Sequence, residues 1–297
     1  MSESAQQAIG RFAPTPSGPL HFGSLVTAVA SYCDVKSRNG LWLLRIEDLD
    51  TPRVVKGSAD DILYTLQNFG FRWDKEVIYQ SERFDEYEQI IQQLIKQEIL
   101  YVCSCTNKSL AAENLSHGPL GLIYPGTCQN KKLPFNSSRL RLKVPQNKIM
   151  TLNDRHFGTY SMDLHKQVGD ILLKRIDGIY AYHLAVVIDD AFQQVNEIVR
   201  GADLLEVSCV HLYLNQILGL TDARYLHLPL AKNSKGQKLS KQTGARAVDT
   251  KKASEQLFAA LTFLGQTIPS ELKLSPVTEL LAYATDHWDN RLIPPID

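Results

Sequence analysis

Two short stretches carry side chains suited to binding the phosphates of a nucleotide. His21-Phe22-Gly23-Ser24 stands at the head of an apolar run, and Lys238-Leu239-Ser240-Lys241-Gln242 lies in a cationic stretch without acids. The first turn of a helix leaves partly positive N–H groups unpaired, and these attract phosphate. A lysine on a loop can neutralise a leaving pyrophosphate. A reaction that needs both is attack on the α-phosphate of ATP, so we expect nucleotidyl transfer with His21 and Lys241 as catalytic residues.

Two other nucleotide-binding classes are not supported. The sequence contains no GxxxxGK[ST] stretch, which argues against a P-loop enzyme, and no GxGxxG stretch, which argues against a dinucleotide-dependent dehydrogenase.

The elements expected around these residues alternate between strands and helices. Arg11–Leu25 reads as a strand, a tight loop and the start of a helix, and the helical pattern over Leu25–Arg38 stops at Asn39-Gly40. Leu41–Ile46 is almost wholly apolar, as in a buried parallel strand, and runs into Glu47-Asp48-Leu49-Asp50. Carboxylates in that position lie where open α/β sheets bind ligands.

The alternation continues along the chain. Amphipathic helices are expected at Gly57–Phe69 and Glu82–Gln97. Ile171–Ile176, an Asp177-Gly178 turn and Tyr180–Ile188 are expected to form a hairpin-like or strand–helix unit. The pattern then predicts strands at Val195–Val199 and Tyr225–Leu230 and helices at Cys209–Leu218 and Lys251–Leu264. Such an order favours a Rossmann-type α/β fold.

Composition sets the class and the compartment. The chain has 297 residues, zero formal net charge, 44% hydrophobic residues and 22% charged residues, as in an ordinary soluble protein. The start, MSESAQQ, is polar and no apolar run nears the ~20 residues of a membrane span, so we expect no membrane association and a cytoplasmic location. Five cysteines are an odd set that favours metal binding over disulfides.

Three of the cysteines are spaced like metal ligands. Cys103 and Cys105 form a Cys-x-Cys pair and Cys128 follows, which is a zinc site short of one ligand. His117 and Tyr124 are the candidates for the fourth ligand, and general chemistry favours the imidazole.

The same region lacks acids. No Asp or Glu occurs between Asn114 and Asn153, whereas several lysines and arginines do. The alternation over Arg139–Val144 predicts a half-exposed strand with a cationic face. We therefore expect part of a polyanion-binding surface here.

These motifs resemble those of a known family. His21–Ser24 resembles the HIGH motif of class I aminoacyl-tRNA synthetases, and Lys238–Gln242 resembles their KMSKS motif. RFAPTPSGPLHFGS, LRIEDLD and VNEIVRGADLL resemble the glutamyl branch. The resemblance implies a Rossmann-type catalytic domain that activates L-glutamate with ATP, and the phosphate chemistry implies Mg²⁺. Ser24 stands in place of a second imidazole, so more of the phosphate contact is expected to rest on His21 and backbone N–H groups.

The resemblance also implies site residues. Those implied for glutamate binding are Arg11, Phe12, Ala13, Pro14, Thr15, Glu47, Tyr182 and Arg200. Those implied for ATP binding are His21, Gly23, Ser24, Lys238, Ser240 and Lys241. The chemistry agrees, because a guanidinium fork suits a carboxylate and Glu47 can accept from an ammonium group. From its sequence context alone, Tyr182 is as readily a half-buried aromatic of a helix as a pocket residue.

For the cysteines, the resemblance changes the expected fourth ligand. The subgroup that this chain resembles has Cys-x-Cys followed by Tyr-x-x-x-Cys, which implies one structural Zn²⁺ held by Cys103, Cys105, Tyr124 and Cys128 instead of His117.

The acceptor follows from the length after the second motif. Only residues 242–297 follow Lys241, so we expect a short helical stem and no anticodon-binding domain. Truncated glutamyl paralogues of this kind transfer glutamate to the queuosine base in the anticodon of tRNA(Asp), which implies queuosine-carrying tRNA(Asp), L-glutamate and ATP as partners. The alternatives are a short glutamyl- or glutaminyl-tRNA synthetase that charges a tRNA 3′ end, and a catalytically silent RNA-binding paralogue. The presence of His21, Glu47, Arg200 and Lys241 argues against the silent paralogue.

We expect four segments. They are the first half of the catalytic domain (1–100), a zinc-binding basic insertion (101–168), the second half with the KMSKS-like loop (169–245) and a helical C-terminal stub (246–297).

Overall fold

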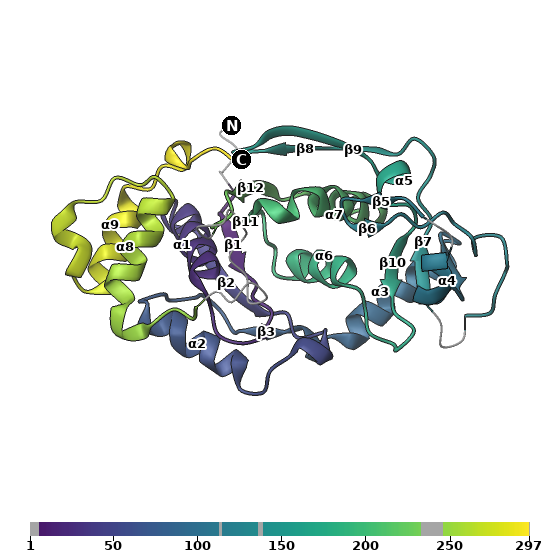
Figure 1. Cartoon of the computed structure of the whole chain (residues 1–297), viewed down its shortest axis with the longest axis horizontal. Helices are drawn as coiled ribbons and strands as arrows, with labels where there is room; N and C mark the ends of the chain where they lie inside the picture. The colour runs from purple at the N-terminus through teal and green to yellow at the C-terminus, as the bar shows by residue number, and fades with distance from the viewer. Residues whose placement is uncertain (1–5, 113–114, 136–138, 233–245, 297) are drawn as a thin grey trace.

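The molecule is built on a seven-stranded, mostly parallel sheet. The computed structural model describes residues 6–112, 115–135, 139–232 and 246–296. Its main sheet has the order β3-β2-β1-β11-β12-β8-β9 (Figure 1). The strands are β1 (Ile9–Phe12), β2 (Leu41–Ile46), β3 (Ile78–Tyr79), β8 (Ile149–Asp154), β9 (Gly158–Asp163), β11 (Glu197–Gly201) and β12 (Arg224–Leu228). Neighbouring strands are parallel except β8 and β9, which are antiparallel. The predicted α/β class is confirmed.

Elements of the first hundred residues match the sequence pattern closely. The predicted strand over Leu41–Ile46 is β2 with the same bounds. The first helix, α1 (Phe22–Lys36), starts three residues earlier than predicted, because His21 takes an extended N-cap conformation and its Nδ1 accepts the backbone N–H of Ser24 at 3.3 Å. The other two predicted helices are α2 (Ser58–Asn68) and α3 (Phe84–Lys96).

The later elements are displaced by a few residues from their predicted positions. The strand predicted at 195–199 is β11, two residues further on, and the helix predicted from Cys209 begins four residues earlier. The elements here are β10 (Ile171–Lys174), α6 (Tyr182–Phe192), α7 (Leu205–Leu218), α8 (Ala253–Phe263) and α9 (Val277–Asp286). Boundaries shift in this way because tertiary contacts, not propensity alone, decide where an element ends.

Helices cover both faces of the main sheet. Helix α1 lies on one face together with α8 and α9, whereas α6 and α7 lie on the other face (Figure 1). On the first side, the fully buried Trp42 stacks on Phe12, with ring centroids 6.2 Å apart. These two apolar layers fix the positions of β1, β2 and β11, whose ends carry the site.

A smaller unit lies at the far end of the molecule from α8 and α9 (Figure 1). Strands β10, β7 (Arg139–Leu142) and β4 (Leu100–Cys103) form an antiparallel sheet in that order. Near it lie α4 (Asn107–Ala112), the hairpin of β5 (His117–Gly118) with β6 (Gly121–Leu122), and α5 (Leu164–Gln167). Strands β8 and β9 fall within 101–168 of the sequence and yet extend the main sheet.

The strand order puts a crevice beside β1. This strand pairs with β2 on one side and with β11 on the other. The connection after β1 leads to β2 and the connection after β11 leads to β12, so the two connections run in opposite directions along the sheet. In open α/β sheets, ligands bind beyond the carboxyl ends of the strands at such a point. Within the described ranges, no helix is long and apolar enough to cross a membrane.

Candidate active site and metal centre

A cavity of about 580 Å³ opens beyond the carboxyl ends of β1, β2 and β11. Its walls come from segments that are far apart in the sequence. The predicted residues that line it are Arg11, Phe12, Ala13, Pro14, Thr15, His21, Gly23, Ser24, Glu47, Tyr182 and Arg200. Lys238, Ser240 and Lys241 lie outside the described residues. The fold therefore brings the predicted glutamate-binding residues and the first phosphate-binding stretch to one place.

Arg11 is held by a carboxylate that the sequence analysis missed. Its Nε donates to Oδ1 of Asp190 on α6 at 3.1 Å, and the same oxygen accepts Nη1 of Arg45 at 2.8 Å. Burial raises the pKa of Asp190, but Arg11 and Arg45 outweigh burial and lower it, so Asp190 stays ionised. Among the described residues, the Nη atoms of Arg11 have no hydrogen-bond partner. The fork of this guanidinium is thus left for a ligand.

Glu47 and Tyr182 stand on the same side of the cavity. Glu47 accepts a hydrogen bond from Nη2 of the fully buried Arg45 at 3.3 Å. Burial raises the pKa of Glu47, and the nearby Arg45 and Arg11 offset only part of this rise. Tyr182 is the first residue of α6 and is 37% exposed. Burial and the nearby Glu47 raise the pKa of Tyr182 to about 12, so its hydroxyl remains a donor at neutral pH.

Arg200 has a protein partner on each of its three nitrogens. Its Nε donates to Nε2 of His227 at 3.3 Å, Nη1 lies 3.4 Å from Nδ1 of His211, and Nη2 donates to Oγ of Ser208 at 2.6 Å. Arg200 therefore has fewer donors left for a ligand than Arg11. Its guanidinium is fixed rigidly in the cavity wall.

His227 is fixed in turn by Asp154. The carboxylate of Asp154, at the end of β8, lies 2.7 Å from Nδ1 of His227, and both side chains are fully buried. Because Nε2 accepts from Arg200, the proton of the imidazole belongs on Nδ1, facing Asp154. Burial lowers the pKa of His227 in spite of this carboxylate, which keeps the ring neutral.

The start of α1 meets the chain that follows the second motif. His21 pairs with Ala247 in an antiparallel bridge, and Val248 donates its N–H to the carbonyl of Leu20 at 2.9 Å. On the other side of 233–245, Ala231 lines the cavity. Both described ends of the segment that contains Lys241 thus lie at the cavity.

The missed residues had only a weak signal in the sequence. Asp189-Asp190 interrupts the apolar helix run HLAVVIDDAF, and His227 interrupts the apolar strand run YLHLPL. A polar side chain in a buried stretch needs a partner, but its partner cannot be named before the fold is known.

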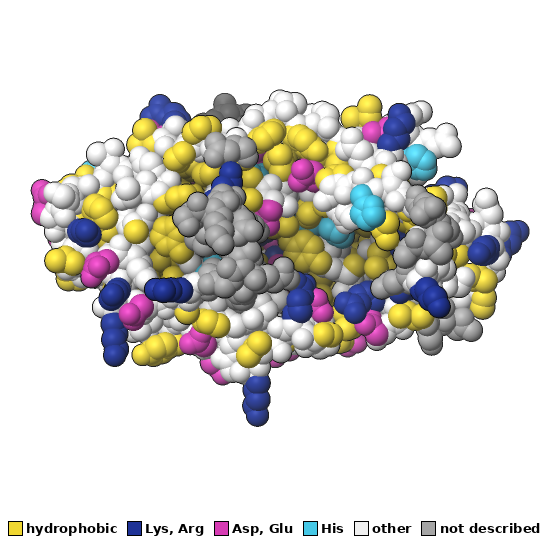
Figure 2. Space-filling model, in the orientation of Figure 1, with side chains coloured by type: hydrophobic (Ala, Val, Ile, Leu, Met, Phe, Trp, Pro, Cys, Tyr) yellow, Lys and Arg dark blue, Asp and Glu magenta, His cyan; other side chains and the backbone are white. Residues whose placement is uncertain are grey.

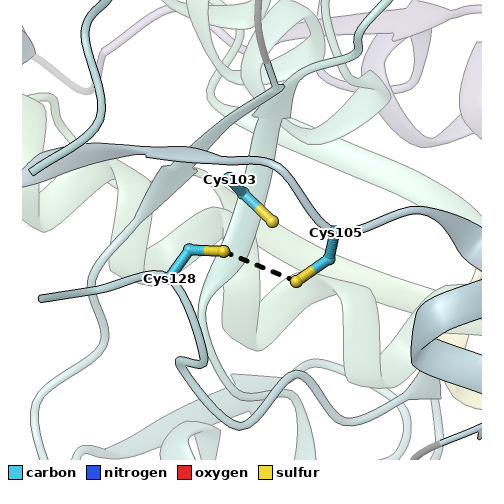
Figure 3. A group of neighbouring side chains, drawn as sticks. All are labelled: Cys103, Cys105 and Cys128. Carbon is cyan, nitrogen blue, oxygen red and sulfur yellow. Dashed lines mark hydrogen bonds between the residues drawn. The ribbon is translucent and has the colours of Figure 1, made fainter. Parts of the chain in front are cut away.

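The three clustered cysteines come together in the smaller unit, as Figure 3 shows. The Sγ atoms of Cys103, Cys105 and Cys128 all lie within 4.8 Å of one another, and Cys105 and Cys128 are 3.5 Å apart. The hydroxyl of Tyr124 lies 3.3 Å from Sγ of Cys103 and 3.5 Å from Sγ of Cys105. Tetrahedral zinc with Zn–S of about 2.3 Å and Zn–O of about 2.0 Å needs ligand atoms about 3.5 to 3.8 Å apart. The spacing of these four side chains suits such an ion.

One thiol of the cluster ionises readily, and two other groups stay protonated. Burial raises the pKa of the Cys105 thiol to about 11 and also raises the pKa of the Tyr124 hydroxyl. Burial raises the pKa of the Cys128 thiol, but hydrogen bonds from Tyr124 and Ser104 outweigh burial and lower it to about 6. Thiolate is the form that binds metal. His117 is exposed on β5 and does not belong to the group of neighbouring ligand atoms.

The predicted cationic face of 139–144 is wrong for Arg141. This side chain is buried, its guanidinium lies 3.8 Å from the ring centroid of Tyr124, and Nη1 donates to the carbonyl of Asp170 at 2.7 Å. Arg139 donates to the carbonyl of Cys105. Both arginines face the cysteine cluster, because the segments that carry Cys105 and Tyr124 lie over that face of β7 and cover the side chains that alternation alone would expose.

Charge on the visible face of the molecule is mixed. In Figure 2, Lys and Arg side chains are spread among Asp and Glu side chains and do not gather in one patch. Three lysines of the acid-free segment are exposed, Lys131, Lys132 and Lys143.

Comparisons with known proteins agree with this architecture. Residues 8–275 match the family model described as tRNA synthetases class I (E and Q), catalytic domain. A glutamyl-Q tRNA(Asp) synthetase of Dechloromonas aromatica is 46% identical over 288 residues, which cover 96% of this chain and 95% of that protein. The protein of the same name in Pseudomonas aeruginosa PAO1 is 46% identical over 286 residues, with 96% and 95% coverage.

A solved structure is also similar. A glutamate tRNA ligase from Elizabethkingia meningosepticum, crystallised with its amino acid, superposes with a TM-score of 0.79 at 25% identity. The match covers 97% of this chain and 66% of the ligase chain. The chain thus spans about two thirds of the length of that ligase.

Proposed function

This chain belongs to the class I tRNA synthetases (E and Q), and on that premise we propose that it activates glutamate with ATP and transfers it to queuosine in the anticodon of tRNA(Asp). The observation that carries the proposal is the 46% identity to a glutamyl-Q tRNA(Asp) synthetase over almost the full length of both chains. The protein is accordingly a ligase.

The cavity supports glutamate as the amino acid. The open Nη fork of Arg11 suits the side-chain carboxylate of glutamate, and Arg200 supplies a second positive charge in the same wall. Glu47 and the protonated hydroxyl of Tyr182 are suited to the α-ammonium and α-carboxylate groups. Asp190 and Arg45 bind no ligand in this scheme but hold Arg11 and Glu47 in place.

The start of α1 supports ATP binding beside the glutamate. His21, Gly23 and Ser24 line the cavity at the helix N-terminus, where backbone N–H groups favour phosphate. Lys238, Ser240 and Lys241 belong to the segment between Ala231 and Ala247, and we assign them to the phosphates by their sequence motif. Mg²⁺ bound to ATP would supply charge neutralisation on the phosphates.

The chemistry is acyl activation followed by transfer. A carboxylate oxygen of glutamate attacks the α-phosphorus, the bond to the β-phosphate oxygen breaks, and pyrophosphate leaves with the electron pair. His21 and Lys241 stabilise the charge that develops on these phosphates. Arg11, Glu47 and Arg200 bind the side-chain carboxylate and the ammonium group of glutamate and so hold its α-carboxylate in line with the α-phosphorus, which contributes by orientation.

We propose that the cluster of three cysteines and one tyrosine holds one structural Zn²⁺. Cys103, Cys105, Tyr124 and Cys128 provide a spacing suited to a tetrahedral ion. A closed site of this kind crosslinks β4 to the loop before β7 and stabilises the smaller unit.

For the RNA partner, the exposed Lys131, Lys132 and Lys143 are candidates for phosphate contacts to the anticodon stem-loop. The bases of such a loop can be splayed out and read singly.

The four-segment division at 100, 168 and 245 is retained as our proposal for the domains. Since the proposed substrate is a tRNA, the reaction belongs in the cytoplasm.

One pair of assays tests the function. The protein should catalyse ATP–pyrophosphate exchange with glutamate in the absence of tRNA, and it should transfer labelled glutamate to tRNA(Asp) that carries queuosine but not to the unmodified tRNA. Absence of exchange would instead support a silent RNA-binding paralogue. Label on the 3′ end of tRNA(Glu) would support the 3′-charging alternative.

A further inference from the structure

A second cavity lies beside the first one, on the side away from the ATP residues. It measures about 270 Å³ and shares Thr15, Glu47, Arg53 and Tyr182 with the first cavity. His21, Gly23 and Ser24 line only the first cavity. A group bound in the second cavity therefore lies beside the glutamate end of the site and away from the ATP end.

The walls of this second cavity suit a flat, partly apolar group. Leu49, Leu172 and Ile179 supply apolar surface, and they come from the connection after β2, from β10 and from the turn before α6. The volume falls below the range of about 300 to 1,000 Å³ for pockets that enclose a drug-sized ligand. It has room for a base with a ring substituent rather than for a whole nucleotide.

One carboxylate in this cavity has an oxygen available. Oδ2 of Asp50 accepts Nε of Arg53 at 2.6 Å. The distance from Oδ1 of Asp50 to Nη1 of Arg175 is 3.8 Å, which is too long for a hydrogen bond. The Asp50 side chain is 29% exposed, so a ligand can reach this oxygen. Arg175 is held elsewhere, by Asp177 at 2.8 Å.

We propose that this second cavity receives the acceptor nucleoside and that Asp50 binds its cationic amine. The inference rests on the proposed function. Queuosine is a 7-deazaguanosine with a cyclopentenediol attached through a secondary amine, which is protonated at neutral pH, whereas unmodified guanosine has no cation there. Asp50 thus distinguishes the modified base from the unmodified one by charge.

The step that follows balances without a further reactant. A hydroxyl oxygen of the diol forms an ester bond with the glutamyl carbonyl carbon. The bond from that carbon to the phosphate oxygen breaks and AMP leaves with the electron pair, while the hydroxyl proton passes to the departing phosphate. The shared wall of Glu47 and Tyr182 sets the approach of the hydroxyl to the glutamyl group.

The test compares Asp50→Asn with Asp177→Asn. Both carboxylates pair with Arg175, but Asp177 does not line the second cavity. The dissociation constants of tRNA(Asp) with queuosine and with guanosine are measured for each protein, together with transfer to the queuosine form. We expect wild type and Asp177→Asn to bind the queuosine form more tightly than the guanosine form. In Asp50→Asn, the ratio of the two dissociation constants should shrink at least tenfold, and the KM for queuosine tRNA(Asp) should rise at least tenfold.

Three results would count against the idea, and they are distinguishable. If wild type transfers glutamate to queuosine and Asp50→Asn keeps the wild-type preference and KM, the acceptor assignment is wrong while the proposed function stands. If wild type does not transfer glutamate to queuosine tRNA(Asp), the proposed function fails and the acceptor assignment fails with it. Equal loss in Asp177→Asn would also refute the assignment, because the effect would then come from Arg175.

Discussion

Arg200 and His227 meet across neighbouring strands at the ligand end of the main sheet, where Nε of Arg200 donates to Nε2 of His227 at 3.3 Å. Asp154 holds the other nitrogen of the ring at 2.7 Å. The guanidinium in the cavity wall is thus oriented through a buried imidazole that does not line the cavity itself.

His227→Phe keeps a ring of similar size but removes the acceptor. A hydrogen bond to a charged group contributes about 1.5 to 3 kcal/mol, so the KM for glutamate in ATP–pyrophosphate exchange should rise about tenfold or more. His227→Gln, which can still offer an acceptor oxygen, should recover part of the loss. A KM that stays at the wild-type value in His227→Phe would show that Arg200 is positioned by its other partners.

Asp190→Asn should destabilise the protein strongly. Asp190 is the common counter-ion of Arg11 and Arg45, and both guanidinium groups are buried. Removing one partner of a buried ion pair costs about 3 to 5 kcal/mol, which chemical denaturation measures. The control is Asp289→Asn, whose pair with Arg291 is exposed and should leave the denaturation midpoint unchanged. Equal midpoints for the two variants would contradict the claim that Asp190 stabilises the fold as the counter-ion of Arg11 and Arg45.

Stability should fall as pH drops below about 6.5. Burial lowers the pKa of His183 to about 4, with Arg200 as a second cause, and burial also lowers the pKa of His211 and of His227. A histidine whose pKa is depressed in the folded state contributes stability above its unfolded pKa. That stability is lost as pH falls through the window between the unfolded and folded values.

For His183 the full effect is on the order of 3 kcal/mol. Melting temperatures between pH 7.5 and pH 4.5 measure it, and His183→Gln should flatten the curve. A melting temperature that does not change over this range would disprove the neutral, buried state of these rings.

Gly169→Ala should disrupt the proposed zinc site. Gly169 has φ of +71°, and a Cβ there would lie 2.1 Å from the carbonyl oxygen of Tyr124. Gly178 is the matched control, since its φ is +84° but a Cβ would meet no atom within 4 Å. We expect Gly178→Ala to cost only about 1 kcal/mol of backbone strain. Gly169→Ala should also lower the zinc content of the purified protein. A wild-type zinc content would show that zinc binding does not depend on the position of Tyr124.

The fourth zinc ligand can be tested by substitution. Tyr124→Phe should lower zinc stoichiometry below one per chain, whereas His117→Ala should leave it unchanged, because the imidazole is exposed and remote from the thiol group. Removal of the metal with a chelator should lower the melting temperature of wild type, since binding stabilises only the folded site. Full zinc content in Tyr124→Phe would refute the assignment.

Much of the fold was predictable because its signals are local. The apolar run at Leu41–Ile46 is β2, and the run after His21 is α1, since a continuous apolar stretch or stripe can be recognised from neighbouring residues alone. The alternation over 139–144 misled for the opposite reason. Whether a strand face is exposed depends on what covers it, and the ring of Tyr124 lies over Arg141 of β7.

The candidate site divides in the same way. The amino-acid sequence by itself predicted the reaction class, because each of the two motifs to which we assign the phosphate chemistry, His21 to Ser24 and Lys238 to Gln242, consists of a few adjacent residues. Only the tertiary structure decided how that chemistry is oriented. Asp190 holds Arg11 from 179 residues away, and His227 holds Arg200 from the next strand of the sheet. Such pairings follow from strand order and helix placement, which depend on the burial of the whole chain and cannot be read from any local stretch.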